Sequence, residues 1–202
     1  MDDTKSIVII EDHPVMQEGL LSYFEKTGKW RVTGTAASLE KSKELLCANT
    51  PDVILLDIQL EDEPGLNIIP WLKNQRGHDS LPVIAVYTSY NDFVHASAAL
   101  GRGVQVYMCK KHSVNDLEKA LCGALNGKIY IDESVQSKLD SVAGILNILT
   151  KREAEIFAMV KSGCQNRQIA QRLNISHRTV ENILCCIYDK TGVHSREKLR
   201  DL

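Results

Sequence analysis

The chain has 202 residues, of which 44% are hydrophobic, and it contains 12 glycines and 5 prolines. This is the composition of an ordinary globular protein and excludes a disordered chain. The N-terminus MDDTKSIVII carries acids where a secretory signal would carry basic residues, and no apolar run approaches the roughly 20 residues of a membrane span. The six cysteines have no CxxC spacing and no metal-like Cys and His spacing, so we expect a cytoplasmic protein with reduced thiols.

Charge is distributed unevenly along the chain. Residues 1–145 hold 14 Lys and Arg against 20 Asp and Glu, a net charge of −6, whereas residues 146–202 hold 10 against 6, a net charge of +4. This asymmetry indicates a chain that handles a cation in its first part and a polyanion in its second.

Strand and helix patterns alternate up to about residue 125. The apolar run Ser6–Ile10 predicts a first strand, and Pro14 suits the first turn of a helix that extends to about Lys26. We expect further strands at 30–36, 53–57, 83–88 and 104–109, and further helices at 39–48, 65–72, 92–100 and 114–125. The helix at 65–72 contains Pro70, which argues against its continuity. Five βα units predict an α/β doubly wound parallel sheet, because each crossover helix must cover the sheet.

After Tyr130 the strand pattern stops, and 134–146 has the length and polarity of a connecting helix or linker. From Thr150 onward the pattern is helical only. Thr150 and Glu153 have the spacing of a capping box, and two shorter helices follow, separated by a turn near 173–176. We therefore expect an α/β domain over residues 1–127, a linker or connecting helix over 128–146, and an all-α helix-turn-helix domain over 147–202.

Five polar residues fall at successive predicted strand ends: Glu11, Asp12, Asp57, Thr88 and Lys110. If the first and third strands are adjacent, the three carboxylates converge, and a hard cation such as Mg²⁺ relieves their repulsion. A hydroxyl and an ammonium at the same edge are donors for phosphoryl oxygens. Each residue alone has an ordinary structural interpretation, as a cap, a strand-end hydroxyl or a solvated charge. Their combination at one edge favours a phosphate-handling site.

One pattern runs through this first part of the chain: Glu11-Asp12, Asp57, Gly65 eight residues later, Thr88 and Tyr107-x-x-Lys110. It resembles the receiver domain of bacterial two-component response regulators, over residues 5 to about 127. The resemblance implies that Asp57 accepts a phosphoryl group from a sensor histidine kinase and that Lys110 pairs with that group.

The same resemblance implies that Thr88 and Tyr107 form the switch. It also implies a set of Mg²⁺ ligands: Glu11, Asp12, Asp57 and the backbone carbonyl of Gln59. From its size, Tyr90 beside Gln59 is expected to hinder a hydrolytic water and slow the loss of phosphate.

Motifs at fixed spacing also fill the last part of the chain: Leu149-Thr-Lys-Arg-Glu153, Gly163-x-x-Asn166-Arg-Gln-Ile-Ala170, Leu173-x-Ile-Ser176, Thr179-Val180 and Ile187-x-x-Lys190-x-Gly-Val193. They resemble the LuxR-type helix-turn-helix of the NarL/FixJ regulators, over about 147–202. The resemblance implies an all-α four-helix domain that binds promoter DNA with its third helix in a major groove. It also implies a homodimer that pairs through the last helix, near 196–202.

The predicted recognition helix presents a poorly basic face. LuxR-type helices usually have Lys where Glu181 stands, and a glutamate there faces phosphates or accepts only from the amino group of cytosine. Basic and polar side chains nearby remain to hold the DNA backbone. The candidate DNA contacts are Arg167, Arg172, His177, Arg178, Thr179, Glu181, Asn182, Cys185 and Lys190.

The sequence therefore predicts a response regulator, not an enzyme, in which phosphorylation of Asp57 controls promoter binding. The alternative is a protein-binding regulator that keeps the receiver switch but does not grip DNA, and the charge of the groove-facing side separates the two. A third class, a phosphohydrolase with Asp57 as covalent nucleophile, has no substrate-pocket signal beyond the acids.

Overall fold

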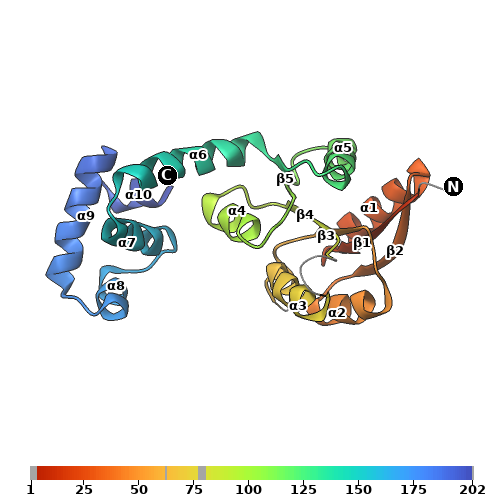
Figure 1. The fold of residues 1–202 in the computed structure, drawn as a ribbon, viewed down its shortest axis with the longest axis horizontal. Coiled ribbons are helices and arrows are strands. Elements are labelled where there is room, and N and C mark those ends of the chain that lie inside the picture. Colours follow the sequence, from red (N-terminus) through yellow and green to blue (C-terminus); the bar gives the residue numbers. More distant parts are fainter. Residues whose placement is uncertain (1–3, 62, 77–80, 202) are drawn as a thin grey trace. The chain divides into compact units, whose positions relative to one another are not determined.

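A computed structural model describes residues 4–61, 63–76 and 81–201 of the chain. The chain divides into two compact units, Met1–Glu133 and Ser134–Leu202 (Figure 1). Among the described residues, no helix is both long and apolar enough to cross a membrane. The expected domain bounds 1–127 and 147–202 stay predictions, and the division falls between them.

Within the described part of the first unit, six parallel strands form one sheet in the order β2-β1-β3-β4-β5-β6. The strands are β1 (Lys5–Ile10), β2 (Trp30–Ala36), β3 (Val53–Leu56), β4 (Val83–Thr88), β5 (Val106–Cys109) and β6 (Tyr130–Ile131). Because β1 pairs with both β2 and β3, the chain winds first to one edge of the sheet and then to the other. The crevice outside the carboxyl ends of β1 and β3 is therefore the topological switch point, where such folds bind ligands.

The crossover helices confirm the α/β doubly wound prediction. They are α1 (Pro14–Thr27), α2 (Leu39–Ala48), α3 (Ile68–Arg76), α4 (Phe93–Leu100) and α5 (Val114–Leu125), with a short 3₁₀ helix η1 (Gly65–Asn67) before α3. Instead of the single helix expected from residue 65, α3 begins at Ile68, which puts Pro70 in its first turn. A proline is tolerated there because the amide groups of the first turn have no intrahelical partner.

Both faces of the central strands are buried, as a parallel sheet covered on each side requires. In β1, Ile7, Val8 and Ile9 are each fully buried. Side chains of α1 and α5, such as Phe24 and Leu121, pack on one face. Polar side chains in the described part of this unit are therefore found at the ends of the strands, such as Glu11 and Asp57 just after β1 and β3.

The sheet has one strand more than the five expected. The two-residue strand β6 pairs with β5 in register Val106↔Tyr130, and is too short to produce an alternating pattern in the sequence. The 16-residue helix α6 (Glu133–Ile148) begins one residue after β6, where the sequence allowed either a helix or a linker.

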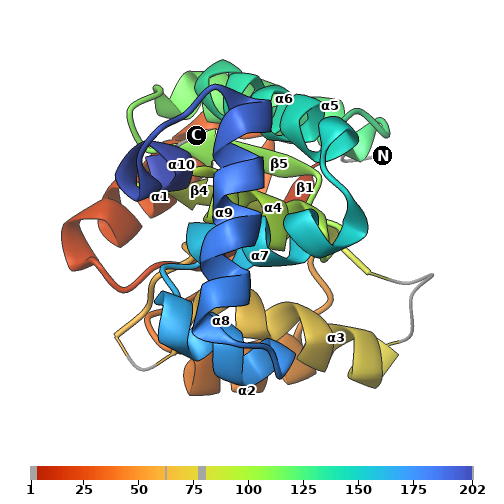
Figure 2. The same cartoon turned by 90° about the vertical axis from the view of Figure 1, so that its left-hand side faces the viewer.

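The second unit is helical, as predicted. It contains α7 (Lys151–Lys161), α8 (Asn166–Leu173), α9 (His177–Thr191) and α10 (Arg196–Asp201), and α9 packs against α7 and α8 (Figure 2). Both bonds of the Thr150 and Glu153 capping box are present. Between α8 and α9, Asn174 adopts a left-handed conformation with φ of 50°, which makes the tight turn of the helix-turn-helix.

Candidate functional site

Strand register brings the first two acids together. Ile10 pairs with Leu56 across β1 and β3, so Glu11 and Asp57 are the next residues of two neighbouring strands. The Asp57 amide donates to the Ile10 carbonyl at 2.9 Å, which holds Asp57 at this edge although β3 itself ends at Leu56. Both carboxylates are buried, Glu11 to 2% and Asp57 to 5% exposure. Two acids this deep require cationic partners.

Lys110 supplies one of these partners. It follows β5, and its Nζ lies 2.6 Å from Asp57 Oδ2 and 2.7 Å from Glu11 Oε2. Burial alone would lower the pKa of Lys110, but the hydrogen bonds to Asp57 and Glu11 outweigh burial and raise the pKa above its ordinary value. The ammonium therefore stays charged and bridges the two acids.

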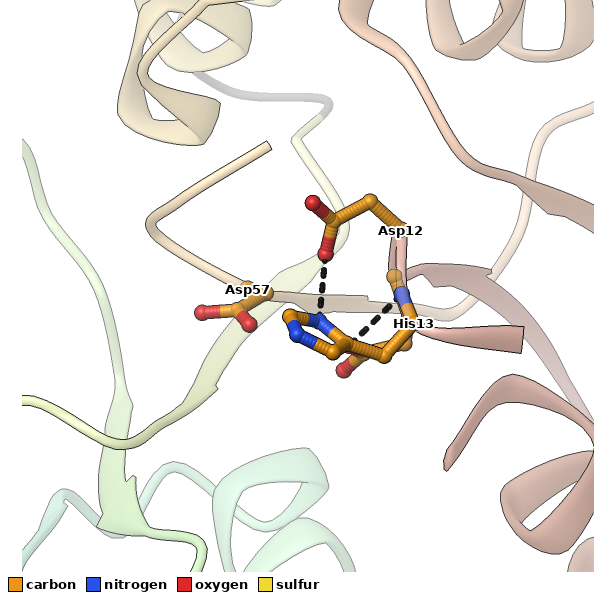
Figure 3. Close-up of side chains that lie close together, drawn as sticks. Asp12, His13 and Asp57 are labelled. Carbon is orange, nitrogen blue, oxygen red and sulfur yellow. Dashed lines mark hydrogen bonds and ion pairs between the residues drawn. The ribbon is translucent and has the colours of Figure 1, made fainter. Parts of the chain in front are cut away.

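Asp12 and His13 complete the cluster (Figure 3). His13 Nδ1 lies 2.8 Å from Asp12 Oδ1, and this hydrogen bond raises the pKa of His13 above its ordinary value. One donor atom each from Glu11, Asp12, His13 and Asp57 lies within 4.8 Å of the others. The sequence prediction did not include His13. Its position directly after the acid pair is the signal that could have suggested it.

The donor chemistry of this cluster fits a hard divalent cation. The cluster holds three carboxylates, and the one ammonium described in contact with it, that of Lys110, pairs with two of them, so oxygen donors and negative charge are in excess. Mg²⁺ is bound in proteins through a few carboxylates together with waters and phosphate oxygens. Gln59 is the remaining predicted ligand, and its backbone N–H donates to Asp57 Oδ1 at 3.4 Å. Its carbonyl as a ligand stays a prediction.

The predicted switch residues lie beside the acids and are linked through Tyr90. Thr88 and Tyr107 are both fully buried. The Tyr107 hydroxyl donates to the Tyr90 carbonyl at 3.0 Å, and the Tyr90 amide lies 3.4 Å from Thr88 Oγ1. Burial raises the pKa of Tyr107, so its hydroxyl remains a donor at any physiological pH. One backbone segment therefore contacts both members of the predicted switch.

Tyr90 also reaches across the mouth of the site. Its hydroxyl donates to the side-chain oxygen of Gln59, and its ring stacks on His95 with 4.1 Å between centroids. Gln59 and Tyr90 both line a hollow of about 410 Å³. It is lined by His13, Val15, Met16, Asp57, Gln59, Thr88, Ser89, Tyr90 and Lys110.

Gly65 is required by close approach of the backbone. A Cβ added at Gly65 would lie 2.1 Å from the carbonyl oxygen of Asp57, far inside van der Waals contact. The Gly65 amide donates to the Ile58 carbonyl at 2.6 Å. This glycine lets the loop after β3 fold back over the residue that carries the central carboxylate.

In the second unit, α9 buries one face and exposes the face that was predicted to contact DNA. Val180, Leu184 and Ile187 are buried. Glu181 pairs with His177 one turn earlier, at 3.5 Å. The candidate DNA contacts are all exposed: Arg167, Arg172, His177, Arg178, Thr179, Glu181, Asn182, Cys185 and Lys190.

Two of these cations have partners inside the unit. Lys190 Nζ lies 2.7 Å from Glu153 Oε2, and Arg172 Nη1 donates to Cys164 Sγ at 3.4 Å. The bond from Lys190, followed by those from Thr150, lowers the pKa of Glu153 to about 2. Lys190 therefore joins the end of α9 to the start of α7, a structural role that sequence spacing alone does not reveal.

Comparison with known proteins assigns both units. Residues 7–122 match the family described as response regulator receiver domain, and residues 147–202 match the family described as bacterial regulatory proteins, luxR family. The nitrate/nitrite response regulator protein NarL of Escherichia coli K12 is 30% identical over 87% of this chain and 84% of its own. The response regulator protein VraR of Staphylococcus aureus is 28% identical over 96% of this chain and 93% of its own.

Solved structures of RcsB have a similar fold. RcsB of Salmonella enterica serovar Typhimurium, bound to promoter P1flhDC in the presence of the phosphomimetic BeF3−, matches with a TM-score of 0.70 and 25% identity, covering 98% of this chain and 96% of that one. Another RcsB–DNA complex matches with a TM-score of 0.72 over the same shares at 24% identity, which supports the fold.

Proposed function

This chain is a response regulator of the NarL/FixJ family, with a receiver domain and a LuxR-type helix-turn-helix, and from that premise we propose that phosphorylation of Asp57 controls its binding to promoter DNA. One observation carries the proposal. Lys110 Nζ lies 2.6 Å from Asp57 within an acid cluster at the switch point of the sheet. A carboxylate beside a fixed ammonium and a cation-binding set is suited to accept a phosphoryl group.

The donor is the phosphohistidine of a sensor histidine kinase. An Asp57 carboxylate oxygen attacks the phosphorus, a P–O bond forms as the P–N bond breaks, and the electron pair returns to the imidazole nitrogen. Lys110 then pairs with phosphoryl oxygens in place of its present contact with Asp57 Oδ2. Glu11, Asp12, Asp57 and the Gln59 carbonyl would hold Mg²⁺, which would supply charge neutralisation for the phosphoryl oxygens.

The switch follows from the added charge. A phosphoryl group brings nearly two negative charges and new acceptor oxygens. The Thr88 hydroxyl is the nearby neutral donor that can turn toward them, and Thr88 lies 3.4 Å from the Tyr90 amide. Movement there alters the Tyr90 carbonyl that Tyr107 holds, and so changes the surface formed by β5 and α4.

DNA binding is proposed for the exposed side of α9 with its neighbours on α8. Arg178 and Asn182 face outward on α9 and offer base contacts, while Arg167 on α8 offers a phosphate contact. RcsB, which has the same fold, is recorded bound to promoter DNA and as dimers on DNA. We extend both features to this chain, as a homodimer on a promoter.

The second candidate function is a protein-binding regulator with the same receiver switch. The observation in its favour is Glu181, an exposed acid on α9 that is paired only partly by His177 at 3.5 Å. DNA binding driven by phosphate contacts weakens steeply with salt, whereas contact with a neutral protein surface does not.

One experiment tests the proposal. The protein is incubated with acetyl phosphate and Mg²⁺, and footprinting is carried out on its own genomic DNA, with Asp57→Ala as the control. We expect a footprint that strengthens on phosphorylation in the wild type only and that fades as salt rises. A footprint absent in both states would refute the DNA-binding function, and wild type that gains no phosphate would refute the role of Asp57.

A further inference from the structure

One of the buried acids of the first unit that lie outside the phosphoacceptor site is Asp132. Asp132 is 1% exposed and stands between β6 and α6. Its amide donates to the Tyr107 carbonyl at 2.9 Å, so the backbone before α6 is bonded to the strand that carries the proposed switch tyrosine. The proposed phosphoryl transfer makes no use of this carboxylate.

The Asp132 side chain binds the loop that presents Lys110. His112 Nε2 lies 2.6 Å from Asp132 Oδ2, and Lys111 Nζ lies 3.3 Å from Oδ1. The Tyr87 hydroxyl donates to the His112 carbonyl at 2.8 Å, which holds the same loop from the strand side. The loop therefore carries three consecutive cationic or ionisable residues, one directed to Asp57 and two directed to Asp132.

Asp57 and Asp132 therefore bind side chains of the same short segment, residues 110–112. The Lys110 amide is held by the Thr88 carbonyl at 2.8 Å, and its ammonium reaches Asp57 at 2.6 Å. A shift of the Lys110 backbone moves Lys111 and His112 with it, because adjacent Cα atoms are joined at a fixed separation of about 3.8 Å. The position of Lys110 and the anchoring of the first turn of α6 are thus mechanically connected.

We propose that Asp132 is a positioning residue, which places Lys110 for phosphoryl transfer through Lys111 and His112 and couples the phosphorylation state of Asp57 to the start of α6. The proposal rests on Asp57 being the phosphoacceptor. Coupling between two sites is reciprocal. If phosphorylation alters the contact of Asp132 with the loop, removal of Asp132 must in turn alter the phosphorylation of Asp57.

A buried ion pair that only stabilises the fold would give a different result. Glu118 offers the matched case, since it is 6% exposed in the same unit. It accepts from Tyr23 at 3.0 Å and Trp30 at 3.2 Å, and pairs with Lys29 at 3.4 Å. Loss of either buried carboxylate costs stability, but only Asp132 contacts the Lys110 loop through the bonds described here.

The first measurement is the rate of Asp57 phosphorylation in the full chain by acetyl phosphate with Mg²⁺, followed by the mass of the intact protein. We expect Asp132→Ala to lower the rate about tenfold, since small misplacement of a catalytic group has effects of this size or larger. Asp132→Asn, which still accepts from His112, is expected to recover part of the rate. Glu118→Gln is expected to stay within about twofold of wild type.

The second measurement is amide hydrogen exchange over residues 131–142, with and without BeF3− as the phosphoryl mimic. We expect exchange in this segment to change on BeF3− binding in the wild type and in Glu118→Gln, and the change to be lost in Asp132→Ala. If Asp132→Ala does not fold, His112→Ala removes the same contact from the loop side, and the same two effects are expected in smaller degree.

Two failures are distinguishable. Wild-type rate together with wild-type exchange response in Asp132→Ala, or in His112→Ala where that variant replaces it, overturns the positioning role and leaves the proposed function intact. Wild type that gains no mass on Asp57 overturns the proposed function itself, and this inference with it. An equal loss of rate in Glu118→Gln also overturns the positioning role, because it would assign the effect to general stability.

Discussion

The acidic edge of the receiver domain and the exposed side of α9 both depend on charge, but the charges are buried in the first and solvated in the second. Glu11 and Asp57 are nearly inaccessible, and Lys110 joins them at 2.6–2.7 Å. On α9, Glu181 and His177 are more than half exposed, and their charged atoms lie 3.5 Å apart, farther than those of the Lys110 pairs. Charges in low dielectric act through fixed geometry, whereas solvated charges act through the summed field that a polyanion meets. Substitutions in the two regions should therefore differ in size and in their dependence on salt.

The largest effect is expected at Lys110. Lys110→Ala removes the only ammonium described in contact with Asp57 and should lower the rate of phosphorylation by acetyl phosphate about 100-fold, the size expected for losing a preorganised charge. Intact-mass kinetics measure this rate. Lys119→Ala, which breaks an exposed pair with Asp116, is the control and should leave the rate unchanged. Equal rates in all three proteins would contradict the geometric role of the buried charges.

Gly65→Ala tests how tightly the same edge is built. The new methyl would collide with the Asp57 carbonyl, so we expect unfolding free energy to fall by about 1–3 kcal/mol, with weaker Mg²⁺ binding. Urea unfolding and Mg²⁺ titration measure the two effects. Gly144→Ala on α6, where a Cβ meets nothing within 4 Å, is the matched control and should gain about 0.5–1 kcal/mol. A tolerated Gly65→Ala would mean that the loop can move away.

On the exposed side, Glu181→Lys reverses one charge. It should tighten promoter binding about tenfold and steepen the dependence of log K on log salt by about one, because one more phosphate contact becomes available. Fluorescence anisotropy at several salt concentrations measures both values. Glu155→Lys makes the same charge change at an exposed position of α7 and serves as the control. If both variants respond alike, net charge and not the face of α9 determines affinity.

A smaller effect is expected at the mouth of the acid site. Tyr90→Ala removes the bridge to Gln59 and should speed the loss of phosphate from Asp57 by a few fold, since water gains access. Tyr90→Phe keeps the ring on His95 and should have a weaker effect. Decay of the phosphorylated mass measures the rate. Loss no faster than wild type in Tyr90→Ala would end the idea that Tyr90 shields the phosphate.

Low pH tests the ion pair between Glu153 and Lys190 in the second unit. The pKa of Glu153 is lowered to about 2 from an ordinary 4.5, so its contribution to stability is present above the ordinary value and is lost as pH falls toward 2. The protection of α7 amides against hydrogen exchange, taken relative to their intrinsic exchange rate at each pH, should therefore fall between about pH 4.5 and 2. In Glu153→Gln this pH dependence should be reduced, and its persistence would assign the acid effect to other carboxylates.

Much of the fold followed from local patterns. The strand 83–88 and the helices 39–48 and 114–125 have their predicted bounds, and the predicted capping box at Thr150 is present. Period-2 and period-3.6 apolar patterns and capping residues depend only on near neighbours, so a sequence displays them directly. The strand β6 was missed because two residues cannot show a period, and η1 was missed because its three residues make only one turn of a 3₁₀ helix.

By itself, the sequence determined the order of strands and helices and the placement of Glu11, Asp57, Thr88 and Lys110 at strand ends. Only the tertiary structure decided which of these side chains touch. It brought Lys110 to both acids and paired Asp132 with His112. The physical reason is range. Periodicity and capping are set within a few residues, whereas a contact between groups 20 to 99 residues apart depends on register and packing across the whole sheet.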